Sequence, residues 1–153
     1  MDVLIDASIL IEHERGRLDL APHVAGRGDR GFLLSVVSVS ELLHGVHRAR
    51  GADQRNRRSA WVEGMLERFP LLPVDLATAR AHARLWAELA ETGRLIGPHD
   101  LWLAAACLAH GLALATANLR EFHRVPGLEV EDWLGRATGT AGTPHPSGEP
   151  RGE

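Results

Sequence analysis

Short apolar runs alternate with longer amphipathic stretches along most of this chain, and the alternation predicts strands and helices in turn. Continuous apolar runs between turn residues are typical of buried strands. They occur as DVLID, FLLSV, LLPV and LALAT, and residues 128–130 predict an edge strand. Because helical patterns fill the intervals, the order of elements predicts an α/β fold with a mostly parallel central sheet flanked by helices.

The helical patterns occupy residues 8–15, 38–49, 53–69, 76–91 and 98–110, with a short turn at 118–122. The fourth carries an apolar stripe with the 3-4-3-4 spacing of a helix: Leu76, Ala79, Ala83, Trp86 and Ala90. The fifth begins at Pro98, which suits a first helical position, and is apolar nearly all round. We therefore expect the fifth helix in the middle of the protein. The tryptophans are interpreted as core or dimer packing: Trp61, Trp86, Trp102 and Trp133.

Helix capping predicts two of the helix starts. Asp75 is the expected N-cap of the fourth helix. The segment SVSE has the pattern of a capping box, which would make Ser38 the N-cap of its helix and place Glu41 at the third helical position.

Composition predicts one domain over residues 1–134, followed by a disordered tail over 135–153 that is nearly devoid of bulky apolar residues. The single Cys107 excludes an internal disulfide and is expected to be buried packing. The N-terminus lacks the basic start of a signal peptide, and no apolar run reaches the roughly 18 residues of a membrane span. A cytoplasmic protein is expected.

Charge adds a local feature to this picture. The net charge of -3 does not by itself indicate nucleic-acid binding, and every basic residue other than histidine is Arg. The densest positive stretch is Arg48, Arg50, Arg55, Arg57 and Arg58. It would serve to attract RNA phosphates, to contact an acidic partner, or simply to solvate a helix face, and the sequence leaves these three open.

Three acids occupy positions that favour a shared site. Asp6 ends a buried strand, while Glu41 and Asp100 are expected in the first turns of two helices. Strand ends and following helix starts meet at the carboxyl edge of an open α/β sheet, where ligands bind. Clustered carboxylates repel one another unless a cation lies between them, and oxygen ligands favour Mg²⁺ or Mn²⁺.

A structural explanation competes for part of this set. An acid in the first turn of a helix stabilises it by about 0.3–1 kcal/mol. The explanation is strongest for Glu41, as half of the expected capping box. It is weak for Asp6, which follows a strand, and for Asp100, which lies among bulky apolar residues.

Four segments carry a resemblance: VLIDASILIE, SVVSVSELLHGVHRA, IGPHDLWLAAACLAHG and LATANLREFHRV. Together they resemble PIN-domain ribonucleases, and more closely the VapC toxins of bacterial toxin–antitoxin pairs, over residues 1 to about 134. The resemblance implies a three-layer sandwich and a Mg²⁺- or Mn²⁺-dependent endoribonuclease whose acidic residues are Asp6, Glu41 and Asp100. It also implies a homodimer and a VapB-like antitoxin that inserts an Arg among the acids.

The fourth acidic position of that family is not obvious here. Asn118 stands where an acid is often found, and Glu121 follows three residues later, so either one, or neither, completes the site. Thr116, at the end of a strand, is a candidate to bind a metal-bound water or a phosphate. His99, Arg48 and Arg50 are candidate substrate contacts.

Three other functions are weighed against metal-dependent RNA cleavage. Two histidines acting as acid and base on the ribose 2′-hydroxyl would need no metal, and the candidates are His44, His47 and His99. A PIN-like module that binds RNA or protein without cutting would not require the acidic trio. A DNA-directed nuclease is disfavoured by the short chain.

Overall fold

The computed structural model describes residues 1–25 and 28–135. Five strands form one sheet in the order β3-β2-β1-β4-β5, and each pairing is parallel. The strands are β1 (Val3–Ile5), β2 (Phe32–Ser35), β3 (Leu71–Leu72), β4 (Ala113–Ala115) and β5 (Val130–Glu131). The predicted parallel sheet is therefore confirmed, and β1 lies at its centre. The expected tail lies, apart from Gly135, outside the described residues.

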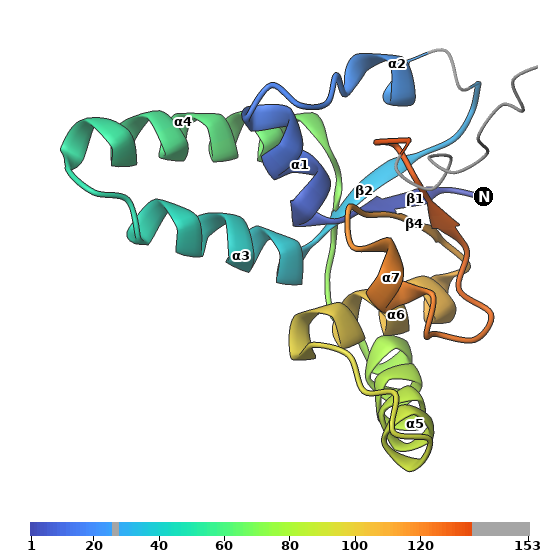
Figure 1. Cartoon of the computed structure of the whole chain (residues 1–153). Helices are drawn as coiled ribbons and strands as arrows, with labels where there is room; N and C mark the ends of the chain where they lie inside the picture. Colours follow the sequence, from blue (N-terminus) through green and yellow to red (C-terminus); the bar gives the residue numbers. More distant parts are fainter. Residues whose placement is uncertain (26–27, 136–153) are drawn as a thin grey trace, which may run out of the picture.

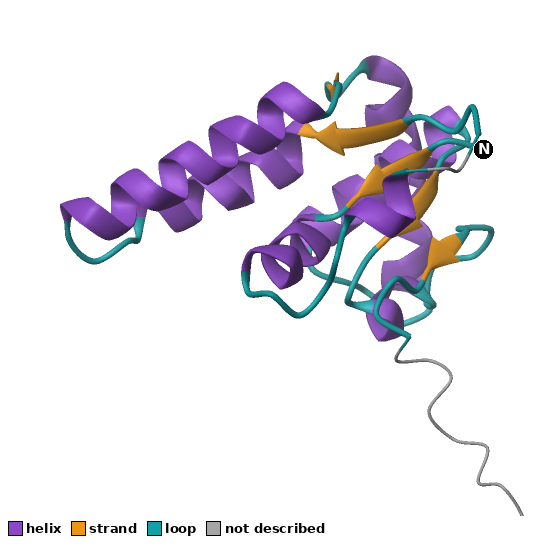
Figure 2. Cartoon of the chain, turned by 90° about the horizontal axis from the view of Figure 1, so that it is seen from above, coloured by secondary structure: helices purple, strands orange, loops and turns teal. Residues whose placement is uncertain are grey.

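Helices cover both faces of this sheet, which makes the three-layer sandwich that the family resemblance implies (Figure 1). They are α1 (Ala7–Glu14), α2 (Ala21–Val24), α3 (Val36–His47), α4 (Ala52–Arg68), α5 (Leu76–Glu91), α6 (Pro98–His110) and α7 (Leu119–Phe122). Helices α3 and α4 form a hairpin that projects away from the sheet (Figure 2). No helix of the described part of the chain is long and apolar enough to cross a membrane.

The alternation of side chains along β1 divides the core into two clusters. Val3 and Ile5 pack with residues of α1, α3 and α4, whereas Leu4 packs on the opposite face with residues of α5 and α6. Leu103 and Ala104 of α6 are completely buried, as expected for the most apolar helix. The core is thus built around the strand that ends at Asp6.

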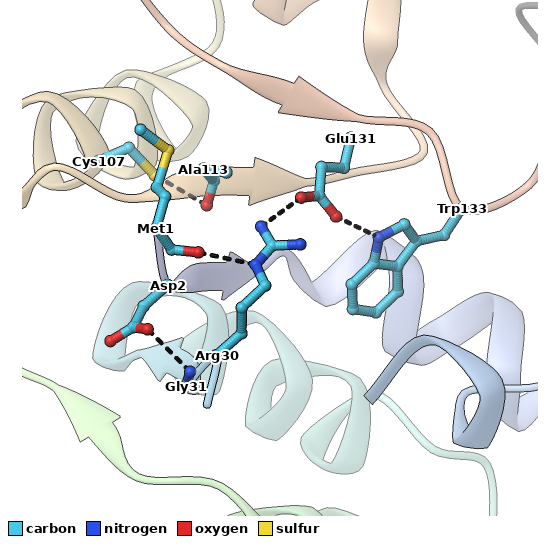
Figure 3. A network of polar contacts seen from close by, with 8 residues as sticks. All are labelled: Met1, Asp2, Arg30, Gly31, Cys107, Ala113, Glu131 and Trp133. Atoms are coloured by element: carbon cyan, nitrogen blue, oxygen red, sulfur yellow. Dashed lines mark hydrogen bonds and ion pairs between the residues drawn. The ribbon is translucent and has the colours of Figure 1, made fainter. Parts of the chain in front are cut away.

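A polar network connects the start of the chain to the segment that contains β5 (Figure 3). The Arg30 guanidinium donates to the Met1 carbonyl at 2.8 Å and to Glu131 Oε1 at 2.5 Å. The Trp133 indole donates to Glu131 Oε2 at 2.8 Å. Arg30 therefore ties β5 to the start of the chain.

The predicted capping box of α3 is wrong. Helix α3 begins at Val36, and its N-cap is Ser35, whose hydroxyl accepts a hydrogen bond from the Val37 amide at 3.1 Å. Pairing of β2 with β1 runs to the residue before Ser35, so the helix starts as soon as the strand ends. Ser38 is consequently inside the helix and buried, and its hydroxyl has no partner among the described residues. Glu41 lies in the second turn, where capping does not explain it.

Helix α5 turns its predicted apolar stripe towards solvent. Leu76 is 66% exposed and Trp86 is 55% exposed. The side chains that α5 buries are Thr78, Leu85 and Leu89, which lie on the opposite face. Core packing is therefore excluded for Trp86. The predicted N-cap is confirmed, since the Asp75 carboxylate accepts from the Thr78 amide at 2.8 Å.

Candidate functional site

Asp6 follows the central strand directly and is held by two hydroxyl groups. Its side chain is 2% exposed. Its Oδ2 atom accepts hydrogen bonds from Ser8 at 2.7 Å and from Thr116 at 2.8 Å. Burial raises the pKa of the Asp6 carboxyl, and the hydrogen bonds from Ser8 and Thr116 act in the opposite direction. Asp6 is therefore oriented by neutral hydroxyl groups, and no ion pair to it is formed within the described part of the chain.

Glu41 lies half-buried on α3 and contacts a residue from a distant helix. The His99 Nδ1 atom lies 2.9 Å from Glu41 Oε1, and the His99 side chain is 60% exposed. Burial raises the pKa of the Glu41 carboxyl, and the negative charge of Asp6 raises it further. The His99 imidazole partly counteracts both effects. The structure thus places His99 against one of the three predicted acids.

Asp100 lies in the first turn of α6, as predicted, and is paired with a fourth acid. A hydrogen bond to Glu121 joins the two carboxyl groups. Burial raises the pKa of Asp100 to about 8, and the hydrogen bond to Glu121 and the charges of Asp6, Glu121 and Glu41 contribute to the rise. A proton on Asp100 is what allows two carboxyl groups to share a hydrogen bond.

Gly97 lies beside this pair at the start of α6. A Cβ atom at this position would lie 3.7 Å from Asp100 Oδ2 and 4.0 Å from Glu121 Oε2. The Gly97 amide also makes a long hydrogen bond, 3.5 Å, to Glu121. The backbone that starts α6 therefore borders both carboxyl groups.

The electrostatic coupling shows that the four acids form one cluster. They come from the end of β1, from α3, from α6 and from α7, which follow different strands of the parallel sheet. The charge of Asp6 raises the pKa of both Glu41 and Asp100, and the charge of Glu41 raises that of Asp100. The acids expected at one edge of the sheet thus lie close enough to shift one another's pKa values.

The structure distinguishes the two candidates for the fourth position. Asn118 is exposed and makes no side-chain capping bond at the start of α7. Only its backbone amide bonds the site, donating to the Thr116 hydroxyl at 3.0 Å. Glu121, one turn later, is the residue whose side chain bonds Asp100. Thr116 is fully buried and serves as the link between Asp6 and this segment.

Sequence reasoning did not identify Ser8 as part of the site. Its hydroxyl donates to Asp6 and accepts from the Ala117 amide at 3.0 Å, so it joins the ends of β1 and β4. A serine two residues after an acid carries no distinctive pattern. Only the neighbouring positions of the two strands in the sheet reveal its role.

A groove of about 680 Å³ lies between α1, α3 and α4, and of the four clustered acids it is Glu41 that lines it. Its lining includes Glu41, the apolar residues Leu42 and Trp61, and the basic residues Arg48 and Arg50. Arg48, Arg50 and Arg58 of the positive stretch thus line the same groove as Glu41, while Arg55 and Arg57 do not.

The acidic cluster suits a divalent cation by the chemistry of its donors, although its side chains do not converge on one point. Among residues 1–25 and 28–135, no three His, Cys, Asp or Glu side chains converge closely enough to ligate one ion together. Glu41 and Asp100 instead have His99 and Glu121 as partners. Mg²⁺ retains several waters in proteins and takes one or two carboxylates. Asp6, Glu41 and Asp100 are oxygen donors with raised pKa values, and among the described residues none of them pairs with an Arg, so the cluster fits Mg²⁺ by its chemistry.

Comparison with known proteins decides the family. The sequence matches the family model described as PIN domain over residues 3–128. The chain belongs to the PIN-domain family. This PIN domain is 33% identical over 130 residues to ribonuclease VapC1 of Rickettsia felis, covering 85% of this chain and 95% of that one. It is 36% identical over 122 residues to the tRNA(fMet)-specific endonuclease VapC of Salmonella typhimurium, covering 80% of this chain and 85% of the relative.

Solved structures agree with the assignment to the PIN domain. DNA-bound VapBC from Salmonella typhimurium matches with a TM-score of 0.71 at 31% identity, covering 87% of this chain and 98% of that one. VapBC2 from Rickettsia felis, bound to a promoter DNA fragment, matches with a TM-score of 0.79 over 87% of this chain and 99% of that one. At 22% identity the second match shows the fold alone. The predicted fold class and family are confirmed.

Proposed function

We propose that this chain is a metal-dependent endoribonuclease that acts as the toxin of a toxin–antitoxin pair. The observation that carries the proposal is the cluster of Asp6, Glu41, Asp100 and Glu121, built from four elements at one edge of the sheet. Support comes from relatives that are named ribonuclease VapC and tRNA(fMet)-specific endonuclease VapC. RNA is accordingly the proposed substrate.

Asp6, Glu41, Asp100 and Glu121 would hold Mg²⁺ or Mn²⁺, directly or through water. Such an ion supplies Lewis-acid stabilisation of the charge that develops on a phosphodiester during hydrolysis. Asp6 is fixed for this task by Ser8 and Thr116. Asp100, whose pKa is about 8, would release its proton as the cation is bound.

Glu121 is the better candidate for the fourth position, and Asn118 is not needed as a ligand. The side chain of Glu121 already bonds Asp100, whereas that of Asn118 faces solvent. Asn118 instead contributes its backbone amide to Thr116. The segment after β4 therefore supplies an acid one turn later than the sequence alone suggests.

His99 is proposed as a positioning residue for Glu41 rather than as a general acid or base. The Nδ1 atom of His99 contacts Glu41. A metal-free mechanism needs two histidines, one as acid and one as base, and this contact contains a single histidine. Of the other two candidates, His44 lines the groove and His47 is exposed. The pairing of His99 with Glu41 favours orientation of a carboxylate over transfer of a proton.

The groove beside Glu41 is proposed to receive the antitoxin. It has an apolar floor that includes Leu42 and Trp61 and a basic rim that includes Arg48 and Arg50. An amphipathic segment with acidic residues would match both features. A guanidinium at its end would neutralise the acids next to the groove. The solved relatives include VapBC complexes, and a VapB-like partner is proposed here on that likeness.

The decisive experiment compares RNA cleavage by the purified wild-type chain and by Asp6→Asn in Mg²⁺, with Asp53→Asn, an exposed acid of α4, as the matched control. We expect cleavage by the wild type and the control, loss with Asp6→Asn and in EDTA, and products with 5′-phosphate and 3′-hydroxyl ends. Sequencing those ends in expressing cells would identify the RNA. Products with 2′,3′-cyclic phosphates, made equally well in EDTA, would exclude the mechanism.

The alternative is a module that binds RNA or protein without cutting. It predicts that the wild type and Asp6→Asn behave alike in every cleavage assay while both still bind RNA. The clustered, uncompensated acids disfavour it, because they would repel phosphate and destabilise the fold without providing a benefit.

A further inference from the structure

We propose that Ser38 is a positioning residue of the acidic site, and that its hydroxyl donates a hydrogen bond to the Glu41 carboxylate when that carboxylate serves a divalent cation. This role rests on the proposed function, because it takes Glu41 as part of a cation site. It concerns a residue that the acidic cluster and the groove do not include.

The Ser38 hydroxyl is buried without a partner. The side chain is 0% exposed, and its Oγ atom is the single buried side-chain nitrogen or oxygen without a hydrogen bond among residues 1–25 and 28–135. A serine inside a helix can donate to the carbonyl four residues earlier. Here that residue is Leu34, which lies in β2 and not in the helix. Because a buried, unpaired hydroxyl destabilises a fold, packing alone does not account for Ser38.

Glu41 is the member of the acidic cluster that shares a helix with Ser38. Residues three positions apart lie on the same side of a helix. Helical side chains lean towards the N-terminus, so the Glu41 side chain lies over the turn that contains Ser38. This turn is the first of α3, and it starts at the edge of the sheet where β1 and β2 end level with each other, Ile5 beside Leu34. The hydroxyl therefore lies at the same edge of the sheet as the acids.

The separation of Ser38 and Glu41 is that of a capping box, but here it lies inside the helix. In a capping box the two side chains bond backbone amides at the helix start. Ser35 takes the N-cap position of α3, and its hydroxyl accepts from the Val37 amide. The side chains of Ser38 and Glu41 are thus left to interact with each other rather than with the cap.

The Glu41 carboxylate can accept a second hydrogen bond. Its Oε1 atom lies 2.9 Å from His99 Nδ1, and within the described part of the chain no other side chain hydrogen-bonds this carboxylate. The terminal torsion of a glutamate side chain is broad, so a modest rotation turns Oε2 towards Ser38. His99 and Ser38 would then hold one oxygen each.

Hydroxyl donors already hold another acid of this site. Ser8 and Thr116 donate to Asp6 Oδ2 at 2.7 and 2.8 Å. A neutral hydroxyl orients a carboxylate without cancelling the negative charge that attracts a cation, which an Arg or Lys would do. Ser38 would give Glu41 the support that Ser8 gives Asp6. Groups that orient the ligands of a metal typically change its affinity by about 10–100-fold.

Calorimetric titration of the full chain with Mg²⁺ tests the proposal. Ser38→Ala should weaken Mg²⁺ binding by about 10-fold. Ser40→Ala removes an exposed hydroxyl of the same helix and should leave the Mg²⁺ affinity unchanged. A higher Mg²⁺ concentration should restore RNA cleavage by Ser38→Ala. In EDTA this variant should unfold at a urea concentration no lower than the wild type does, which separates weaker binding from damage to the fold.

Two further variants separate a hydrogen bond to Glu41 from an effect of packing. Ser38→Cys has a side chain of similar shape but a weak donor, so it should bind Mg²⁺ as weakly as Ser38→Ala. Ser38→Ala should add no further loss to Glu41→Gln. The gain in Tm at millimolar Mg²⁺, which also reports weak binding, measures this coupling.

The possible failures are distinguishable. A Ser38→Ala chain that binds Mg²⁺ as tightly as the wild type would overturn the role of Ser38 and leave the acidic site intact. Equal losses of affinity with and without the Glu41 carboxylate would do the same. A wild type that neither binds Mg²⁺ nor cleaves RNA would overturn the proposed function, and the role of Ser38 with it.

Discussion

Asp100→Asn is expected to stabilise the metal-free protein at alkaline pH, although it removes a proposed active-site residue. The raised pKa of Asp100 means that the folded chain keeps a proton that the unfolded chain has already released. The free energy of unfolding therefore falls as the pH rises from about 4, the ordinary value, to about 8, and this contribution is flat above that. An amide carries no charge to desolvate and can still donate to Glu121.

The size of the effect follows from the pKa. Each pH unit between the ordinary value and about 8 is worth about 1.4 kcal/mol, which would give roughly 6 kcal/mol for a carboxylate fully removed from water. Asp100 is only partly buried and its charge is screened, so we expect about 1–2 kcal/mol. For a domain of this size, that corresponds to an increase in Tm of about 3–8 °C.

The assay is thermal unfolding of the wild type and Asp100→Asn in EDTA at pH 6 and at pH 8.5, with Asp53→Asn as an exposed control. The variant should have a higher Tm than the wild type at pH 8.5. The difference in Tm should be much smaller at pH 6, where the wild-type carboxyl is protonated. Added Mg²⁺ should raise the Tm of the wild type and narrow the gap. An Asp100→Asn protein less stable than the wild type at pH 8.5 in EDTA would refute the reasoning.

Three further outcomes follow from the contacts of the site and of α3. Glu121→Gln should weaken Mg²⁺ binding, measured by calorimetry, by about 10–100-fold. Asn118→Ala should leave the Mg²⁺ affinity nearly unchanged. The reverse result would assign the fourth position of the site to Asn118. His99→Gln should reduce cleavage by about 10-fold, and calorimetry should show weaker Mg²⁺ binding. An unchanged Mg²⁺ affinity would show that the imidazole does not orient Glu41. In urea unfolding, Ser35→Ala should cost about 1 kcal/mol, while Ser38→Ala should be neutral or stabilising, since its buried hydroxyl has no partner in the described structure; equal losses would contradict the assigned cap.

The parts of the fold that were predictable are those whose signal is local. The runs that form β1, β2 and β4 are apolar without interruption, because a central parallel strand is buried on both faces. The central position of helix α6 is predictable because its residues are apolar nearly all round, and Leu103 and Ala104 are completely buried. Asp6 and Asp100 could be singled out because each interrupts such a segment.

The parts that were not predictable depend on the sheet. Ser35 and Ser38 are both good caps by type, and the choice between them follows from where β2 stops pairing with β1. Helix α5 has two apolar faces, and only its packing against α6 determines which one is buried. The contact of Glu41 with His99 joins residues far apart in the sequence, for which no periodic pattern exists.

The clamp of Arg30 on Glu131 has a consequence for local unfolding. Strand β5 holds β4 through only two residues, and the short helix that carries Glu121 lies between these strands in the chain. If the clamp opens and Trp133 also leaves the core, the distal end of the segment from Thr116 to Trp133 is released, and Glu121 can move away from Asp100. Amide hydrogen exchange should then show this segment opening as one unit, at a lower free energy than β1, with the acidic cluster losing a member before the central sheet unfolds.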